Sequence, residues 1–255
     1  MSDKLSVTII TKNEEENIER CLRSVDWADE IVVVDSGSQD NTVQICRQFG
    51  CLIVESEWLG FGKTKQLAVD TASNDWILSI DADEELSQPL QKEISELTNQ
   101  GFDDNAYRIR RSSFYLSKMI RYCGWQSDAP LRIFNRNQGG FNDKSVHESV
   151  ITAQKIVSLK NRMLHYTYPT LESHFRKMKF YGDIAAENLY KKSKNCSSTG
   201  AIVRGLAKFI KMYTLQFGFL DGIIGYKLCK NSAWGVWYKY NQLHKLNSTT
   251  EPKDK

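Results

Sequence analysis

An apolar run that ends in acids places the strongest constraint on the fold of this chain. Residues Trp76–Ile80 are apolar apart from one serine, and they lead directly into Asp81-Ala82-Asp83 and two glutamates. A short apolar run of this kind is typical of a strand that is buried on both faces of a parallel sheet. Open α/β sheets bind their ligands at the carboxyl ends of such strands. The run therefore predicts a carboxylate cluster at a ligand-binding sheet edge.

The chain before this run alternates apolar segments with segments of helical periodicity. We expect strands at Leu5–Thr11, Glu30–Asp35 and Cys51–Glu55. Helices are expected at residues 14–25, with Asn13 as cap, at residues 41–49 and at Lys63–Ala72. Strands that alternate with helices of this length predict βαβ units. The fold class is therefore α/β, with a mixed, mainly parallel sheet.

Two common nucleotide-binding signatures are absent from the sequence. No G-x-G-x-x-G follows the first expected strand, and no G-x-x-x-x-G-K-[ST] occurs in the chain. A nucleotide at this sheet edge is then expected to be held by carboxylates and a metal. Mg²⁺ and Mn²⁺ prefer oxygen ligands and reach substrate phosphates through one or two carboxylates. The alternative is that these acids only solvate a turn and cap the next helix.

The pattern becomes less regular after Glu85. We expect a helix from Ser87 to about Gln100 and strands at Ala106–Arg111 and Leu131–Asn135. The segment between these strands, residues 112–130, is irregular and rich in aromatic residues. Aromatic side chains beside a carboxylate site suit the wall of a sugar-binding cleft, but ordinary core packing explains them equally well.

Cysteine usage and the apolar segments indicate the cellular setting. The six cysteines are scattered without a C-x-x-C pair, which argues against a zinc site and for a reducing compartment. The first residues lack the apolar core of a signal peptide. The longest apolar stretch, residues 215–228, is interrupted by Asp221 and falls short of the roughly 20 residues that span a membrane. We therefore expect a cytoplasmic protein.

The C-terminal part of the chain is strongly basic. Residues 161–245 hold 14 Lys and Arg against 4 Asp and Glu. We expect helices at Leu171–Lys192 and Ala201–Phe217, the second with an apolar face and with Arg204, Lys208 and Lys211 on another face. Such a helix is typical of an element that lies on an anionic membrane surface. A helical subdomain with a solvated basic face is the alternative, and no recognised nucleic-acid fold accompanies the charge.

Aromatic residues near the end of the chain fit the same interpretation. A membrane-surface element often carries Trp and Tyr at the level of the lipid headgroups. The residues in question are Trp234, Trp237, Tyr238 and Tyr240.

Four sequence blocks stand in order over residues 5–85: Thr8–Glu14, Val33–Thr42, Lys63–Gln66 and Ile80–Asp83. Together they resemble the family-2 glycosyltransferases, which have the GT-A fold. Four later segments make the resemblance more specific. They are Gly124-Trp125, residues 131–134, Val146-His147-Glu148 and residues 218–222. They are similar to bacterial lipopolysaccharide core β-1,4-glucosyltransferases that act on a heptose.

The resemblance implies a role for each matching residue. Glu14, with Glu15 as fallback, is expected at the nucleoside, and Asp35 is expected to accept a hydrogen bond from uracil. Lys65, or Lys63, is expected near the diphosphate. In the metal motif, Asp81 would face the ribose and Asp83 would bind Mg²⁺ or Mn²⁺. Glu148 is expected to be the general base, and His147 to approach the metal; the family more often has a pair of acids at this place.

The resemblance implies an inverting, metal-dependent transfer of a hexose, with UDP-glucose as the expected donor, to a heptose of a lipid-linked core. Two alternatives remain open: transfer of a UDP-sugar to another lipid-linked or glycan acceptor, and a non-catalytic membrane scaffold with the same fold. The expected domains are a GT-A catalytic domain at residues 1–165, a basic, membrane-proximal helical region at 166–245 and a disordered tail at 246–255. Within the catalytic domain, residues 1–100 would bind the nucleotide sugar and 101–165 the acceptor. The protein is expected to attach peripherally to the inner face of the inner membrane and to bind no nucleic acid.

Several of these residues also have a simpler explanation. Glu14 could only complement a helix dipole, and Asp35 could only form a turn. Lys63 and Lys65 could be exposed helix lysines, and His147 a buried, hydrogen-bonded imidazole. Arg132, on an expected strand, could reach the acceptor or only pair with an acid.

Overall fold

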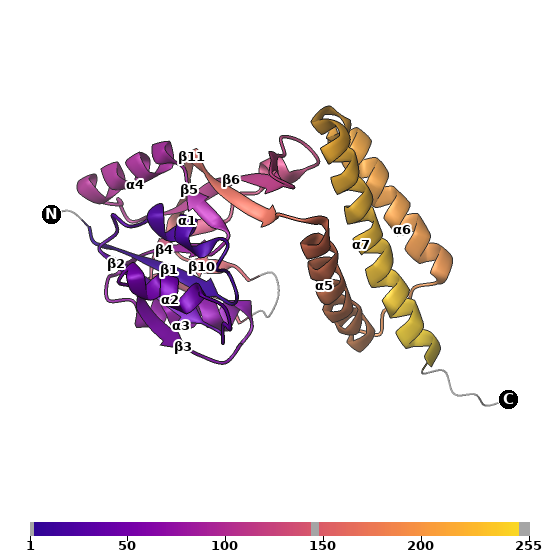
Figure 1. The fold of residues 1–255 in the computed structure, drawn as a ribbon, viewed down its shortest axis with the longest axis horizontal. Coiled ribbons are helices and arrows are strands. Elements are labelled where there is room, and N and C mark those ends of the chain that lie inside the picture. Colours follow the sequence, from indigo (N-terminus) through magenta and orange to yellow (C-terminus); the bar gives the residue numbers. More distant parts are fainter. Residues whose placement is uncertain (1–2, 144–147, 250–255) are drawn as a thin grey trace. The chain divides into compact units, whose positions relative to one another are not determined.

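The computed structural model describes residues 3–143 and 148–249, which fold as two compact units (Figure 1). The sheet unit runs up to Ser112 and continues at Ser127–Tyr166. The helical unit comprises Ser113–Gln126 and the chain from Thr167 onward. Two of the three boundaries between the units fall within the strands Asn105–Tyr115 and Lys155–Tyr168, and the third falls within the 3-10 turn Trp125–Ser127.

Most strands belong to one mixed sheet with the order β3-β2-β1-β4-β8-β6-β11-β5. A separate two-stranded ribbon pairs β9 with β10. The bounds are β1 Leu5–Thr11, β2 Glu30–Asp35, β3 Leu52–Glu55, β4 Trp76–Asp81, β5 Glu84–Leu86, β6 Asn105–Tyr115, β7 Lys118–Met119, β8 Leu131–Asn135, β9 Gly139–Phe141, β10 Val150–Thr152 and β11 Lys155–Tyr168.

The first four strands form the parallel part of this sheet. β1 lies between β2 and β4, with Val7 opposite Ile31 on one side and Leu78 on the other. β3 extends the parallel part beyond β2, whereas β8 runs antiparallel to β4. Because successive side chains of a strand point to opposite faces, these buried strands contribute to two cores.

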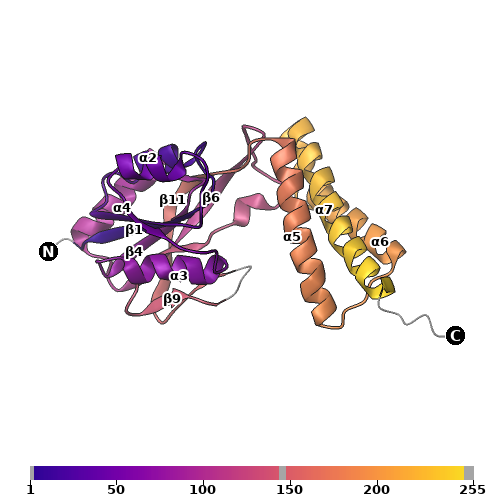
Figure 2. The ribbon, with the colours of Figure 1, turned by 60° about the horizontal axis from the view of Figure 1, so that its bottom comes forward.

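Helices cover both faces of the sheet (Figure 2). One core joins Val7, Ile9 and Leu78 to apolar residues of α1, α2 and α4. The other joins Ile10 and Val34 to α3. These helices are α1 Ile18–Arg23, α2 Thr42–Gln48, α3 Phe61–Thr71 and α4 Gln88–Gln100. This layered arrangement leaves the carboxyl ends of the parallel strands to be occupied by loops.

The helical unit is built on three helices: α5 Leu171–Lys191, α6 Ser198–Ile210 and α7 Gly222–Thr249. α7 packs against both α5 and α6, and a π-helical turn at Lys211–Leu215 and a 3-10 turn at Gly218–Asp221 join α6 to α7. A further apolar cluster holds residues of this unit from distant parts of the sequence, among them Tyr115, Ile120, Met212 and Leu228.

The α/β class, the mixed sheet with its parallel first half and the helical C-terminal part are confirmed. Several details of the sequence prediction are wrong. Asn13 does not cap α1, which begins at Ile18 after Asn17. The second C-terminal helix begins at Ser198 and ends at Ile210, because a π-helical turn interrupts it. The sequence prediction also lacks helix α7 of the helical unit and the strands β5 and β11.

Candidate active site

Two acids that end the strands on either side of β1 lie at the same edge of the sheet. Asp35 closes β2 and is paired with Thr11 of β1, while Asp81 closes β4 and is paired with Ile10 of β1. The parallel register therefore brings the two acids to either side of the end of β1. This is the sheet edge at which ligands of open α/β sheets bind.

Side-chain hydrogen bonds join the loops that follow β1 and β2. The backbone nitrogen of Asn13 donates to Ser38 Oγ at 2.8 Å, and its side-chain oxygen accepts from Gln39 N at 2.8 Å. Asn13 has a φ of 55°, a left-handed conformation that asparagine tolerates better than most residues. The loop that carries Glu14 is thereby fixed beside the loop after Asp35.

Asp35 is buried and organises its own turn. Its Oδ2 accepts from the backbone nitrogens of Gly37 at 3.0 Å and Ser38 at 2.8 Å, and its Oδ1 accepts from the Ser38 hydroxyl. Asp35 therefore does stabilise a turn, as its simpler explanation predicts. Asp35 also lines a hollow of about 610 Å³ with Val43, Glu55 and other residues at the ends of β2 and β3. A turn that presents one carboxylate to such a hollow is compatible with the expected uracil contact.

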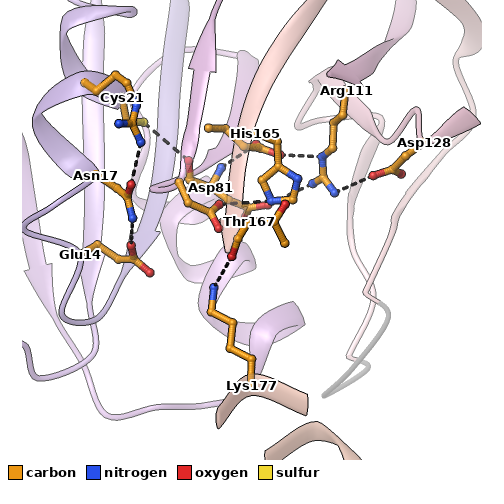
Figure 3. A network of polar contacts seen from close by, with 12 residues as sticks. Glu14, Asn17, Cys21, Asp81, Arg111, Asp128, His165, Thr167 and Lys177 are labelled. Atoms are coloured by element: carbon orange, nitrogen blue, oxygen red, sulfur yellow. Dashed lines mark hydrogen bonds and ion pairs between the residues drawn. The ribbon is translucent and has the colours of Figure 1, made fainter. Parts of the chain in front are cut away.

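Glu14 lies before α1 and not in its first turn. Its backbone nitrogen donates to Thr42 Oγ1 at 2.8 Å, and its Oε2 accepts from Asn17 Nδ2 at 2.8 Å. Figure 3 shows Asn17 beside Glu14. α1 begins at Ile18, and the backbone oxygen of Glu14 accepts from Ile18 N at 2.8 Å, so Glu14 stands at the N-terminal end of this helix.

Lys65 joins two of the expected site residues. Its Nζ lies 2.7 Å from Asp81 Oδ1 and 2.8 Å from Glu148 Oε1, and only 5% of the lysine side chain is exposed. The lysine projects from α3, which packs against β1 and β2. The explanation of Lys65 as an exposed helix lysine is therefore wrong, while Lys63 is exposed.

Two arginines complete the surroundings of Asp81. Arg132 of β8 lies 2.7 Å from Asp81 Oδ2 and 2.6 Å from Glu84 Oε1. Arg111 of β6 lies 3.2 Å from Asp81 Oδ2 and 2.7 Å from Glu84 Oε1, and Figure 3 shows it between Asp81 and Asp128. Arg132 therefore pairs with two acids, which is one of the two roles that the sequence left open for this residue. We name Lys65, Asp81, Glu84, Arg111, Arg132 and Glu148 the ion cluster.

The three cations of the ion cluster govern the ionisation of Asp81. Burial by itself would raise the pKa of Asp81, but Arg132, Lys65 and Arg111 together hold it well below its ordinary value. For Arg132, burial opposes the charge, yet Asp81 and Glu84 raise its pKa further above the ordinary range. Asp81 and Arg132 therefore both favour their charged forms in this cluster. Asp81 is engaged by cations, so its carboxylate suits a metal ion poorly unless a ligand first displaces them.

Asp83, the acid expected to bind the metal, lies beside His165. His165 Nε2 lies 3.6 Å from Asp83 Oδ1, and the backbone oxygen of Asp83 accepts from Tyr166 N at 2.9 Å. Burial would lower the pKa of His165, but its interaction with Asp83 raises it overall. His147 lies outside the described residues. Within residues 3–143 and 148–249, no three His, Cys, Asp or Glu side chains are grouped so as to hold a metal ion.

The donor set at Asp83 nevertheless fits Mg²⁺ or Mn²⁺ in one respect. These ions are commonly bound through only one or two protein carboxylates, with substrate phosphates and water completing the shell. Asp83 is two residues beyond Asp81 at the same strand end, so it would supply one such carboxylate. A protein site with three ligands of its own is not required for an ion that arrives with a diphosphate.

A second hollow, of about 470 Å³, lies between α1 and α4 and is lined by Glu16, Arg20, Glu85, Gln88 and neighbouring residues. Neither this hollow nor the one at Asp35 is lined by Lys65, Asp81, Asp83 or Glu148. The expected base and the expected metal ligand thus lie outside both hollows.

Arg111 and His165 were not predicted as site residues. Arg111 ends an expected strand, and its alternating pattern gives no sign that the side chain faces inward. His165 belongs to β11, which was not predicted, and it lies opposite Glu84 of the three-residue strand β5. The sequence contained only an indirect signal for these two residues. A group of buried carboxylates requires cationic partners nearby, but it does not say which residues they are.

The sequence matches the model of the family "Glycosyl transferase family 2" over residues 6–204, well over half of the chain. An uncharacterized glycosyltransferase of Rickettsia bellii is 31% identical over 264 residues, which covers 99% of this chain and 90% of the relative. An uncharacterized glycosyltransferase of Rickettsia typhi is 33% identical over 240 residues, covering 88% of this chain and 80% of the relative.

A relative with a more specific name is more distant. The lipopolysaccharide core biosynthesis glycosyltransferase LpsC of Rhizobium meliloti is 24% identical over 229 residues, covering 87% of this chain and 85% of LpsC. Among solved structures, S. aureus TarS 1-349 in complex with UDP aligns with a TM-score of 0.48 at 16% identity, covering 98% of this chain and 93% of that chain. On the family match and on the Rickettsia relatives, the chain belongs to glycosyl transferase family 2.

Proposed function

We propose that this chain is an inverting glycosyltransferase that moves a hexose from a UDP-sugar, with UDP-glucose as the expected donor, to a heptose of the lipopolysaccharide inner core. The observation that carries the proposal is the position of Lys65, which joins the strand-end acid Asp81 to Glu148. A cation and a carboxylate at one strand end are the two groups that the transfer requires. The acceptor is supported by the name of LpsC and by the resemblance described above.

In the proposed reaction, a hydroxyl oxygen of the acceptor attacks the anomeric carbon of the donor. Glu148 takes the hydroxyl proton while the new carbon–oxygen bond forms. The bond between the anomeric carbon and the diphosphate oxygen breaks, and the electron pair leaves with UDP. Because attack and departure occur on opposite faces of the sugar, one displacement inverts the anomeric configuration.

The cations of the ion cluster would stabilise the departing diphosphate. Charge develops on the phosphate oxygens as the bond breaks, and fixed cations in a buried site stabilise it more strongly than water does. In the absence of a ligand, Lys65 is paired with both Asp81 and Glu148. A diphosphate at the strand end would draw Lys65 toward itself and release Glu148 to act as a base.

The expected metal has a limited part in this proposal. Asp83 would hold Mg²⁺ or Mn²⁺ together with the phosphates. When bound, the ion would offset negative charge on the leaving group. Glu14 and Asp35 would fix the nucleoside, and the hollow beside Asp35 supports that placement.

Purified protein tests the proposal directly. Incubation with UDP-glucose, a divalent metal and a heptose-containing core oligosaccharide should give a glucosylated product and UDP. UDP-galactose, and acceptors such as a polyprenyl phosphate, distinguish transfer to the heptose from transfer to another acceptor. If the protein binds UDP and Mn²⁺ but transfers sugar to none of these acceptors, a non-catalytic scaffold is the better explanation.

A further inference from the structure

Helix α6 exposes its large apolar side chains and buries its small residues. The buried residues of α6 are Ala201 and Gly205, whereas Ile202, Leu206 and Ile210 are about half exposed. A Cβ at Gly205 would come within 3.1 Å of the backbone oxygen of Ala233 in α7. The small residues therefore permit close packing of α6 on α7, and the apolar face points away from it. This is the reverse of the usual amphipathic arrangement.

The turn that joins α6 to α7 carries a denser group of exposed apolar residues. Within nine positions, five large side chains are at least 46% exposed, and the highest value is 73% at Leu215. They are Leu215, Phe217, Phe219, Leu220 and Ile223, and we name residues 215–223 the apolar tip. Isolated exposed apolar residues are common, but a contiguous group marks a surface that meets an apolar partner.

The apolar tip is held in a fixed conformation. Asp221 is buried, and its carboxylate accepts from the backbone nitrogens of Arg121 at 3.1 Å and Tyr122 at 2.9 Å. Gly218 is packed so closely that a Cβ would lie 2.7 Å from Cys229 Sγ. Phe217 has a φ of 55°, a conformation that is strained for an aromatic residue. The protein thus maintains a strained backbone in order to present apolar side chains to solvent, and strain of this kind is concentrated at functional sites.

Only basic charge surrounds the apolar tip in this part of the chain. Between residues 188 and 249 the sequence has one acid, Asp221, and that acid is buried. The exposed basic residues nearest the tip in sequence are Lys211 and Lys227, with Arg204 and Lys230 further along α6 and α7. Exposed apolar side chains with a purely basic border are complementary to an anionic lipid surface.

Two of the aromatic residues that the sequence suggested for the headgroup level, Trp234 and Tyr238, have contacts within the helical unit. Trp234 stacks on Tyr238 at 5.1 Å and meets Phe175 of α5 at 5.1 Å. Tyr238 donates to Asp183 at 3.0 Å. These side chains are half-buried within the helical unit. They therefore pack α7 against α5, and the apolar tip is the better candidate for contact with lipid.

We propose that the apolar tip and the exposed face of α6 form a docking surface for an anionic lipid bilayer. The tip would enter the boundary between headgroups and acyl chains, while Lys211 and Lys227 contact the phosphates. No helix within the described residues is long and apolar enough to cross a membrane. The proposal is independent of sugar transfer, because vesicle binding can be measured without donor or acceptor.

The test is co-flotation of the full chain with vesicles of phosphatidylglycerol and phosphatidylcholine, compared with phosphatidylcholine alone. We expect the double variant Leu220→Ser/Ile223→Ser to bind the anionic vesicles at least tenfold more weakly than the unmodified protein. Ile151→Ser/Phe180→Ser is a matched control, since both of these side chains are apolar and similarly exposed but lie outside the tip. It should bind within twofold of the unmodified protein. Lys211→Gln/Lys227→Gln should lose about fivefold for each charge on anionic vesicles only.

Two results would overturn the proposal. One is equal binding by the tip variant and the control, with circular dichroism showing both to be folded. The other is an unmodified protein that does not float with anionic vesicles. Light scattering after gel filtration identifies the competing occupant: a dimer that the tip variant dissociates would assign this surface to a second copy of the chain.

Discussion

Lys65 Nζ lies 2.8 Å from Glu148 Oε1, although the two residues are 83 positions apart in the sequence. The same nitrogen lies 2.7 Å from Asp81 Oδ1. The lysine therefore holds the expected base and the expected strand-end acid in one buried group. Removal of the lysine would take this cation away from Glu148, whose side chain is 17% exposed, while Asp81 would keep Arg111 and Arg132; loss of one partner of such an ion pair is costly in free energy.

Lys65→Met is expected to destabilise the sheet unit by about 3–5 kcal/mol, the usual cost of breaking a buried ion pair from one side. Asp81 and Glu148 would then lie close together without the cation between them. Urea unfolding followed by circular dichroism measures the loss. Lys63→Met is the matched control, because Lys63 lies on the same helix and is exposed. Its effect should stay within about 0.5 kcal/mol.

Glu148→Gln is expected to lower kcat by about 10²–10⁴-fold, because the amide cannot accept the acceptor proton. The KM for UDP-glucose should change little, since Glu148 is assigned to the acceptor side. Steady-state kinetics measure both constants. Glu96→Gln on α4 removes an exposed carboxylate in the same way and should leave both constants unchanged. Equal activity of the two variants would remove Glu148 from the proposed mechanism.

Asp83→Asn is expected to abolish the stabilisation of UDP binding by Mn²⁺. The carboxylate supplies the oxygen ligand, and its amide is a far weaker ligand for a hard cation. Calorimetry with UDP, with and without Mn²⁺, measures the coupling in both proteins. Turnover that persists undiminished after exhaustive chelation would show that the cations of the ion cluster suffice without a metal.

The helical unit is expected to lose stability in acid through His174. This histidine is buried beneath Tyr168, and the Tyr115 hydroxyl lies 2.9 Å from its Nδ1. Burial lowers the pKa of His174 to about 4 from an ordinary value of 6.5. The unfolded chain therefore binds the proton first, so stability present above about pH 6.5 is lost as the pH falls toward 4.

The expected loss between about pH 7 and pH 5 is roughly 1–2 kcal/mol. Urea titrations at a series of pH values measure it. His174→Gln, which cannot titrate, should be less stable at neutral pH but should show a shallower dependence on pH. An unchanged slope in that variant would assign the acid sensitivity to other groups.

The parallel half of the sheet was predictable because each of its strands is a short and mainly apolar run. The same pattern brought Asp35 and Asp81 to one edge, since the register of parallel strands follows from burial on both faces. Lys65 was proposed from the family resemblance, and its burial could not be read from helical periodicity. One of its two partners is Asp81 at the end of β4, and the other is Glu148, which is far away in the sequence.

The second half of the sheet was less predictable for a physical reason. β5 has three residues and exists through its pairing with β11, in which Glu84 lies opposite His165. Such a strand has no periodicity of its own, so the sequence indicated only a cluster of acids. Arg111 likewise became a site residue through the pairing of β6 with β8, because that pairing decides which side of the strand faces Asp81.

The most direct test of transfer at the ion cluster is the anomeric configuration of the product made by purified protein from UDP-glucose and a heptose-containing acceptor. The donor carries an α-linked glucose, so a single displacement should yield a β-linked product in the NMR spectrum. The Lys65→Met variant should form that product at least 100-fold more slowly, because removal of a group that stabilises charge on the leaving group usually lowers kcat by about this factor. The Lys63→Met variant should match the unmodified protein. An α-linked product, or equal rates for the two lysine variants, would contradict the proposed mechanism.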